Sequence, residues 1–200
     1  MKETKQKRQR RDNKRYKDIL DASAKVFRKK GYHHANISDI AKEVGLQKGS
    51  LYYYIEGKEE LLYEIIMLAL DLYVESLRGI VIYGRPADEA IKEAIIAHME
   101  PIGIQFDHIY VFLNEMRNLH DKYKKEVESE LQNYERLWTR LLEEGKASGL
   151  LRSDVDSKIT MLAIFGMCNS IVRWFNSEGK YSITELAEIY ARIILDGIKA

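Results

Sequence analysis

Residues 36–54 read NISDIAKEVGLQKGSLYYY, and this stretch decides the fold. The spacing of its apolar residues predicts two short helices, at 37–44 and 48–55. Asn36 is suited to cap the first helix, and Gly45 is suited to end it. Two short helices joined by so tight a turn form a helix-turn-helix when they pack on a preceding helix.

The residues before this stretch supply the preceding helix. Apolar side chains from Tyr16 to Phe27 recur every three to four residues, which predicts an amphipathic helix that stops at Gly31. Residues 1–11, MKETKQKRQRR, lack such a period, and we expect a mobile basic arm there. We therefore assign residues 12–57 to an N-terminal three-helix domain.

The rest of the chain repeats the helical pattern without a convincing strand or internal repeat. A connecting helix is expected at 58–78, and Gly84-Arg85-Pro86 marks a loop after it. Further helices are expected at 88–105 (with Pro101 kinking or splitting it), 107–118, 121–148, 156–176 and 184–197. The predicted fold is all-α with about nine helices, and residues 58–200 form a second, larger helical domain.

Composition excludes several classes of protein. The 200 residues are 46% hydrophobic and 32% charged, which is typical of a folded soluble protein. The longest mostly apolar run, Ile159 to Val172, is too short to span a membrane, and no apolar segment follows Met1 as a secretion signal. The single cysteine, Cys168, excludes an internal disulfide framework. We expect a soluble, cytoplasmic protein without a membrane partner.

Charge is unevenly placed along the chain although the net charge is only +1. The first sixty residues hold sixteen Lys and Arg against nine Asp and Glu, whereas the remainder is acidic. A basic first third on an acidic remainder indicates a nucleic-acid-binding head. A basic tail that only aids solubility gives the same balance, so charge alone does not decide between them.

The motifs of common enzymes are missing from the sequence. It contains no G-x-G-x-x-G, no P-loop and no H-E-x-x-H, and Cys168 lies in an apolar stretch. His33 and His34 are adjacent, but no cysteine or carboxylate pattern accompanies them as metal ligands. We therefore expect no catalytic activity, no metal and no cofactor.

The second short helix is the part of a helix-turn-helix that enters the major groove of DNA. Gln47 and Lys48 can reach base edges, because glutamine pairs with adenine and lysine with guanine acceptors. Gly49 allows close backbone approach, and hydroxyl and ammonium groups suit phosphate oxygens. The predicted DNA-binding residues are Asn36, Gln47, Lys48, Gly49, Ser50, Tyr52, Tyr53 and Lys58. An ordinary three-helix core with surface tyrosines would give the same pattern.

Three segments within residues 15–65 keep a close spacing: Gly31-Tyr32-x-x-Ala35-Asn36-Ile37-x-x-Ile40-Ala41, Gly45-Leu46-x-Lys48-Gly49-Ser50-Leu51-Tyr52 and Lys58-Glu59-Glu60-Leu61-Leu62. Together they resemble the TetR family of bacterial transcription regulators. Gln47 departs from the serine that commonly caps the second helix, and Ile55 departs from the usual phenylalanine. The resemblance implies a homodimer on a double-stranded, pseudo-palindromic operator and a C-terminal domain that binds an inducer. A non-specific DNA-packaging protein would not need that acidic, aromatic-rich domain.

The last two long helices carry apolar seams suited to helix packing. On pattern alone, these seams are as well explained by the chain's own core as by a dimer face, and the resemblance favours the dimer. The candidate dimer residues are Ile164, Cys168, Ile171, Phe175, Leu186, Ile189, Tyr190 and Ile193.

A ligand pocket is expected where polar or bulky residues interrupt apolar helix faces. The candidates are His98, Met99, Phe106, Tyr110, Asn114, Arg117, Trp138, Asn169 and Trp174. The segments Asn114-Glu115-x-Arg117-Asn118-Leu119, Tyr134-Glu135 and Gly166-x-x-Asn169-x-x-x-Arg173-Trp174-Phe175, together with Tyr123, resemble the acyl-CoA-responsive, lipid-degradation branch of the family. This implies a repressor released by a small hydrophobic inducer such as a fatty acyl-CoA, with Arg117 near its phosphates. An efflux-type regulator with an aromatic drug-like ligand is the alternative, and the sequence does not distinguish a repressor from an activator.

Overall fold

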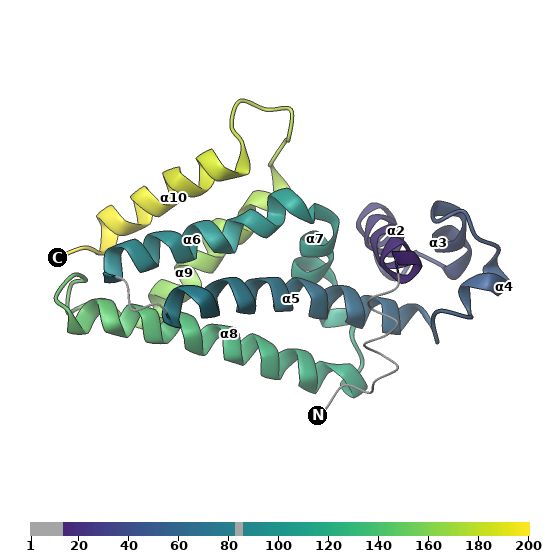
Figure 1. The fold of residues 1–200 in the computed structure, drawn as a ribbon, viewed down its shortest axis with the longest axis horizontal. Coiled ribbons are helices and arrows are strands. Elements are labelled where there is room, and N and C mark those ends of the chain that lie inside the picture. Colours follow the sequence, from purple (N-terminus) through teal and green to yellow (C-terminus); the bar gives the residue numbers. More distant parts are fainter. Residues whose placement is uncertain (1–13, 83–85) are drawn as a thin grey trace. The chain divides into compact units, whose positions relative to one another are not determined.

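The computed structural model describes residues 14–82 and 86–200, and confirms the all-α prediction (Figure 1). Across these residues there are nine α-helices and two short 3-10 helices. The one other regular pairing in this part of the chain is an isolated bridge between Leu151 and Lys199. The predicted basic arm at 1–11 and most of the predicted loop at Gly84-Arg85-Pro86 lie outside the described residues.

The helices follow the predicted order with some different ends. They are α2 (Lys14–Lys30), α3 (Ile37–Glu43), α4 (Lys48–Leu51), α5 (Lys58–Ile82), α6 (Ala87–Ile104), α7 (Phe106–Glu115), η1 (Met116–Asn118), α8 (Asp121–Ala147), α9 (Ser157–Ser170), η2 (Ile171–Arg173) and α10 (Ile183–Ile198). Helix α4 ends before the predicted position 55, because the backbone N–H of Tyr54 turns back to the carbonyl of Leu51. Pro101 lies inside α6 without splitting it.

The chain forms two compact units that do not follow the order of the sequence. The head unit comprises the described residues up to Ala69 together with Asp107–Val127. The body unit comprises Leu70–Phe106 and Glu128–Ala200, apart from residues 83–85. Helices α5 and α8 therefore each run from one unit into the other.

The first three helices of the head unit pack around a shared apolar core. Ile19 and Phe27 of α2 are fully buried, as are Ile40 of α3 and Leu51 of α4. Burying a side chain of this size contributes about 1.5–3 kcal/mol, which fixes α4 although it is a single turn long. The tight turn before α4 depends on Gly45, whose φ of 69° is the left-handed conformation that favours glycine.

The segment Asp107–Val127 belongs to the head unit although it is distant in sequence. Asp107 forms an ion pair with Arg28 of α2. His33 Nε2 donates to Asn118 Oδ1 at 3.0 Å. The segment is thus tied to α2 and to the turn that follows it.

The beginning of α5 is attached to the same segment. The rings of Tyr63 and Tyr123 stack with their centroids 4.4 Å apart. The backbone N–H of His120 donates to Glu59 Oε1 at 3.0 Å. The head unit therefore contains the first turns of α5 and α8 as well as the three N-terminal helices.

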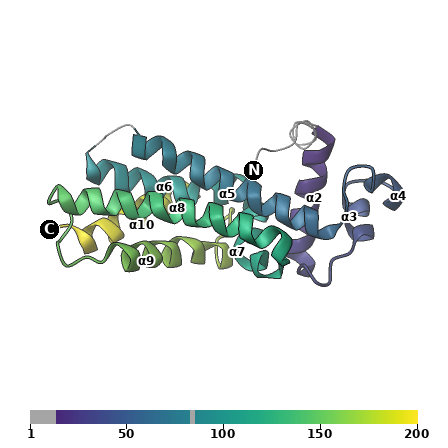
Figure 2. The same ribbon diagram turned by 90° about the horizontal axis from the view of Figure 1, so that it is seen from below.

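The body unit is a bundle of long helices. Helix α10 packs mainly on α6, and α9 contacts both. In this unit α5 lies beside α8 (Figures 1 and 2). The rings of Tyr73 on α5 and Tyr134 on α8 meet there, with their centroids 5.6 Å apart. Helix α10 extends beyond Gly197, which was expected to end it. Among the described residues, none of the helices combines the length and the apolar character needed to cross a bilayer.

Candidate nucleic-acid interface

The start of α3 is fixed by reciprocal hydrogen bonds. Asn36 Oδ1 accepts from the backbone N–H of Asp39 at 3.0 Å, and the Asp39 carboxylate accepts from the backbone N–H of Asn36 at 3.1 Å. Lys30 and this backbone N–H hold the pKa of Asp39 below its usual value. The predicted cap is thus confirmed, and it positions the first turn of α3.

Helix α4 presents its first residues to solvent. The backbone of Gln47 is extended before the helix, and its side chain makes no capping hydrogen bond. Gln47, Lys48 and Gly49 are exposed, and 84% of Tyr53 is exposed. Because Leu51 is buried on the opposite side, these polar groups are held outward on a fixed turn.

An open hollow of about 540 Å³ lies where α3 and α4 meet α5. Its lining residues are Ala35, Asn36, Ile37, Ser38, Lys48, Tyr52 and Lys58. Four predicted DNA-binding residues meet here, whereas Gln47, Gly49, Ser50 and Tyr53 lie on or beside α4 outside the hollow. Ser38 was missed by the sequence reasoning, and its place in the first turn of α3 was the available signal.

Lys58 is more constrained than the sequence suggested. Its Nζ donates to the carbonyl of Tyr32 at 2.8 Å and to the carbonyl of Ala35 at 2.9 Å. The same Nζ lies 4.4 Å from the centroid of the Tyr32 ring. An ammonium group has three donors, so Lys58 holds the turn before α3 and keeps one donor for an anion.

The donors around the hollow define what it can bind. It is lined by two ammonium groups, two hydroxyls and an amide, and no carboxylate lines it. Such groups contact the phosphates of a nucleic acid and set its register, whereas base edges are read by residues that enter the groove. The lining of the hollow is therefore chemically suited to a phosphate, and the exposed start of α4 lies next to it.

Comparison with known proteins agrees with this geometry. Residues 19–65 match the family described as "Bacterial regulatory proteins, tetR family", and residues 84–198 match "Tetracyclin repressor-like, C-terminal domain". The chain belongs to the TetR family. As a member, it is a ligand-responsive transcriptional repressor and not an enzyme.

The TetR family contains relatives that match nearly the whole chain. The transcriptional repressor KstR2 of Rhodococcus jostii is 28% identical over 90% of this chain and 89% of its own length. The fatty acid metabolism regulator protein of Bacillus subtilis is 25% identical over 92% of this chain and 95% of its own length. The solved structure of the fatty acid degradation regulator FadR from Bacillus halodurans is 27% identical and superposes with a TM-score of 0.72, covering 91% of this chain and 98% of that one.

The predicted ligand residues of this TetR-family chain fall in separate places. His98, Trp138 and Asn169 come together in the body unit, and Met99 is buried there. Phe106 is half-buried in the same unit, and Trp174 is exposed. The other three belong to the head unit. Tyr110 and Asn114 are half-buried there, and Arg117 is exposed.

His98 lies at the centre of a group that we call the aromatic cluster, made of Tyr73, His98, Tyr134, Trp138 and Phe165. The ring of His98 stacks on Tyr73 with centroids 4.9 Å apart and on Phe165 with centroids 5.0 Å apart. The sequence analysis did not list Tyr73 or Phe165, and it quoted Tyr134 only within a resemblance, because aromatic residues at helical spacing look like ordinary core.

Both ring nitrogens of His98 have partners. Nδ1 lies 2.7 Å from the hydroxyl of Tyr134, and Nε2 lies 3.0 Å from Asn169 Oδ1. An amide oxygen only accepts, so Nε2 carries the proton and Nδ1 accepts from Tyr134. Burial lowers the pKa of His98 to about 4, and the imidazole is therefore neutral at physiological pH.

The predicted dimer residues differ in exposure. Four of them lie in the core of the single chain: Ile164, Cys168, Ile171 and Leu186. Phe175, Ile189 and Tyr190 are half-buried, and Ile193 is exposed. The large apolar residues of α9 that are exposed are instead Ile159 and Leu162, which the sequence analysis did not single out.

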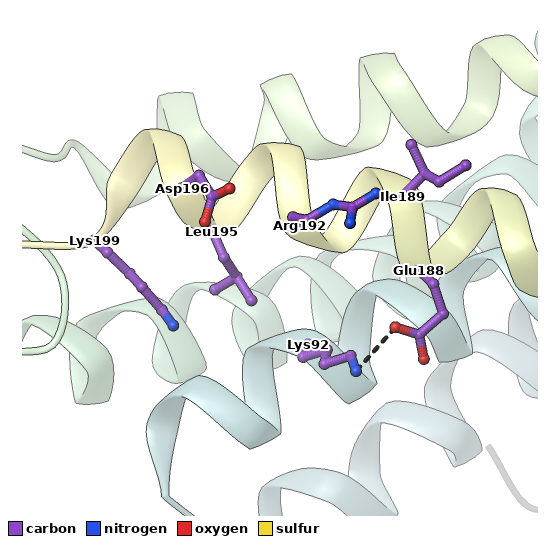
Figure 3. Close-up of a pocket in the computed structure, with 7 residues that line it drawn as sticks. All are labelled: Lys92, Glu188, Ile189, Arg192, Leu195, Asp196 and Lys199. Atoms are coloured by element: carbon purple, nitrogen blue, oxygen red, sulfur yellow. Dashed lines mark ion pairs between the residues drawn. The ribbon is translucent and has the colours of Figure 1, made fainter.

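A second hollow, of about 320 Å³, lies between α6 and α10 (Figure 3). Its lining residues are Lys92, Glu188, Ile189, Arg192, Leu195, Asp196 and Lys199, and Lys92 pairs with Glu188 at 2.9 Å. Acidic and basic side chains are mixed along this hollow, so it favours neither anionic nor cationic ligands. In the described part of the chain, no three His, Cys, Asp or Glu side chains gather as a metal site.

Proposed function

We propose that this chain acts in the cytoplasm as a homodimer that represses transcription from a pseudo-palindromic operator and releases it when a fatty acyl-CoA thioester binds the body unit. The observation that carries the proposal is the exposed start of α4 beside a hollow lined with phosphate-binding groups. In this arrangement Gln47 reads a base edge, while Asn36, Ser38, Lys48, Tyr52 and Lys58 hold the DNA backbone.

The dimer follows from the operator and from the body unit. Two half-sites about one helical turn apart need two heads at a fixed separation. The body unit offers exposed apolar side chains on its last two helices, Ile159 and Leu162 on α9 and Ile193 on α10. Exposed apolar groups of this kind suit a surface that a second copy covers.

The ligand class is supported by the relatives and by the body unit. Two of the relatives are regulators of fatty acid metabolism and of fatty acid degradation. The helices of the body unit pack through long apolar faces. An acyl chain can insert between two such faces only if the helices move apart locally. A ligand shifts the DNA-binding equilibrium only through unequal affinity for the two forms, typically by about 1–3 kcal/mol. Helices α5 and α8 carry such a change between the units, since each is part of both.

Replacing Gln47 or Lys48 by alanine separates base reading from backbone contact. We expect Gln47→Ala to weaken operator binding about tenfold while leaving random duplex binding unchanged, because it removes one base contact. Lys48 lines the hollow, so Lys48→Ala should weaken binding to operator and to random duplex alike, by about tenfold. The salt dependence of DNA affinity should also fall by about one released counterion. Fluorescence anisotropy at several salt concentrations measures both effects.

The matched control is Lys124→Ala, which removes an exposed lysine from α8 and should change neither binding curve. Equal losses on operator and random DNA for Gln47→Ala would contradict its assignment to a base edge.

Adding acyl-CoA thioesters to the operator complex tests the ligand class. We expect release that grows with chain length, because each buried methylene contributes about 0.8 kcal/mol to binding. Anisotropy of labelled operator across a chain-length series measures it, with free coenzyme A as the control. If no chain length releases DNA, the acyl-CoA proposal is wrong, but the assignment of the chain as a TetR-family repressor is unaffected.

A further inference from the structure

The outer side of α10 carries charged side chains whose sign alternates along the helix. They are Glu188, Arg192 and Asp196 on α10, and Lys199 directly after it. All four line the hollow between α6 and α10 (Figure 3). Residues three or four apart share a helix face, so acidic and basic groups follow one another over about three turns.

Two neighbours in this series are available to a partner outside the chain. Glu188 is already bound to Lys92 of α6 at 2.9 Å. Arg192 and Asp196 are exposed and one turn apart, yet neither forms an ion pair within the part of the chain that the structure describes. The guanidinium of Arg192 instead points toward Ile189, away from Asp196 (Figure 3).

The order of these charges is complementary to itself. A two-fold axis between antiparallel copies of one helix places the residues on its two sides opposite each other. An axis beside Ile194 therefore sets Arg192 against Asp196 of the second copy, and Asp196 against the second copy's Arg192. The same axis brings Lys199 within one residue of Glu188 of the second copy. A parallel pair would instead set Arg192 against Arg192, and like charges in contact are repelled.

Uncharged residues on the same side of α10 fit this arrangement. Ile193 lies beside Arg192 and is 54% exposed. Gly197 is exposed, and the space that a side chain would fill there is open. The same axis places Ile193 close to Gly197 of the second copy, where no side chain prevents contact between the helices. The charged series thus continues the apolar surface to which Ile193 belongs in the proposed dimer.

We infer that α10 pairs antiparallel with α10 of a second copy about a two-fold axis beside Ile194, so that Arg192 of each copy binds Asp196 of the other. The inference rests on the proposed homodimer. It adds the orientation of the two helices, the residues that fix it, and a reason why the chain selects its own copy. A related chain with a different order of charges would meet this surface with like charges or with none.

Two charge reversals, Arg192→Asp and Asp196→Arg, test the pairing in the full-length protein. Either variant alone makes both facing pairs like-charged, so we expect its dimerisation to weaken at least about a hundredfold. When the two variants are mixed, the aspartates of one face the arginines of the other, and mixed dimers should form to the exclusion of homodimers. Such rescue also shows that each variant is folded.

Light scattering after size-exclusion chromatography measures the dimerisation, and native mass spectrometry identifies the mixed dimers because the two variants differ in mass. The matched controls are Arg140→Asp and Glu144→Arg, which reverse an exposed pair with the same spacing on α8. Each control variant should remain dimeric, and a mixture of the two should contain mixed dimers and homodimers in statistical proportion.

The pairing is wrong, while the proposed homodimer stands, if the single reversals remain dimeric or if their mixture shows no preference for mixed dimers. A monomeric unmodified protein would overturn the proposed homodimer and the pairing together. If the variants exchange as expected but the unmodified dimer binds no operator, the pairing stands and the proposed function is wrong.

Discussion

Replacing both Ile159 and Leu162 by glutamate is expected to convert the proposed dimer to monomers and to lower operator affinity at least about a hundredfold. These side chains are 63% and 47% exposed, and three residues apart on α9 they lie on one helix face. A carboxylate in an apolar interface must lose its hydration without gaining a partner. Loss of the second head removes half of the DNA contacts and the avidity that links two half-sites, which is worth about 10²–10⁴ in affinity.

Size-exclusion chromatography with light scattering measures the change in mass, and anisotropy on full and half operators measures the affinity. Arg136→Glu places the same charge on an exposed position of α8 and should leave the protein dimeric. A double glutamate variant that remains a dimer would show that the copies meet elsewhere.

Acidification from about pH 7 to about pH 4.5 should lower the free energy of unfolding of the unmodified protein about 2 kcal/mol more than that of His98→Gln. Burial lowers the pKa of His98 from 6.5 to about 4, so between these values the unfolded chain binds a proton that the folded chain does not. Stability is therefore fully present above the unfolded pKa and is lost as the pH falls toward the folded pKa. Glutamine retains a donor and an acceptor but does not titrate.

Urea unfolding at the two pH values measures the difference between the proteins. Burial also lowers the pKa of His108, which acts in the same direction, but this contribution is common to both proteins and cancels. An equal pH dependence for the two proteins would show that His98 is not held neutral in the fold.

Local sequence was sufficient to predict the helix-turn-helix. The Asn36 cap and the left-handed Gly45 depend on residues within a few positions, so their pattern is visible in a single stretch. The two hydrogen bonds of Lys58 could not be predicted in this way. Its acceptors lie 26 and 23 residues earlier in the chain, and no local period connects them.

Periodicity in the body unit identified apolar faces but not what covers them. Ile164 and Cys168 keep the same spacing as a dimer seam, yet they are buried within one chain. Ile159 and Leu162 are equally apolar and are exposed. His98 and Trp138 were singled out as polar or bulky interruptions, whereas the side chains that surround them come from α5, α8 and α9 and meet only in three dimensions.

The attachment of Asp107–Val127 to the head unit has a consequence for protein engineering. A chimaeric regulator made by grafting only the first sixty residues onto a foreign C-terminal domain would separate Arg28 from Asp107 and His33 from Asn118. Transplanting Asp107–Val127 with the N-terminal residues keeps both pairs native, so the exchangeable cassette for new sensors is discontinuous in the gene.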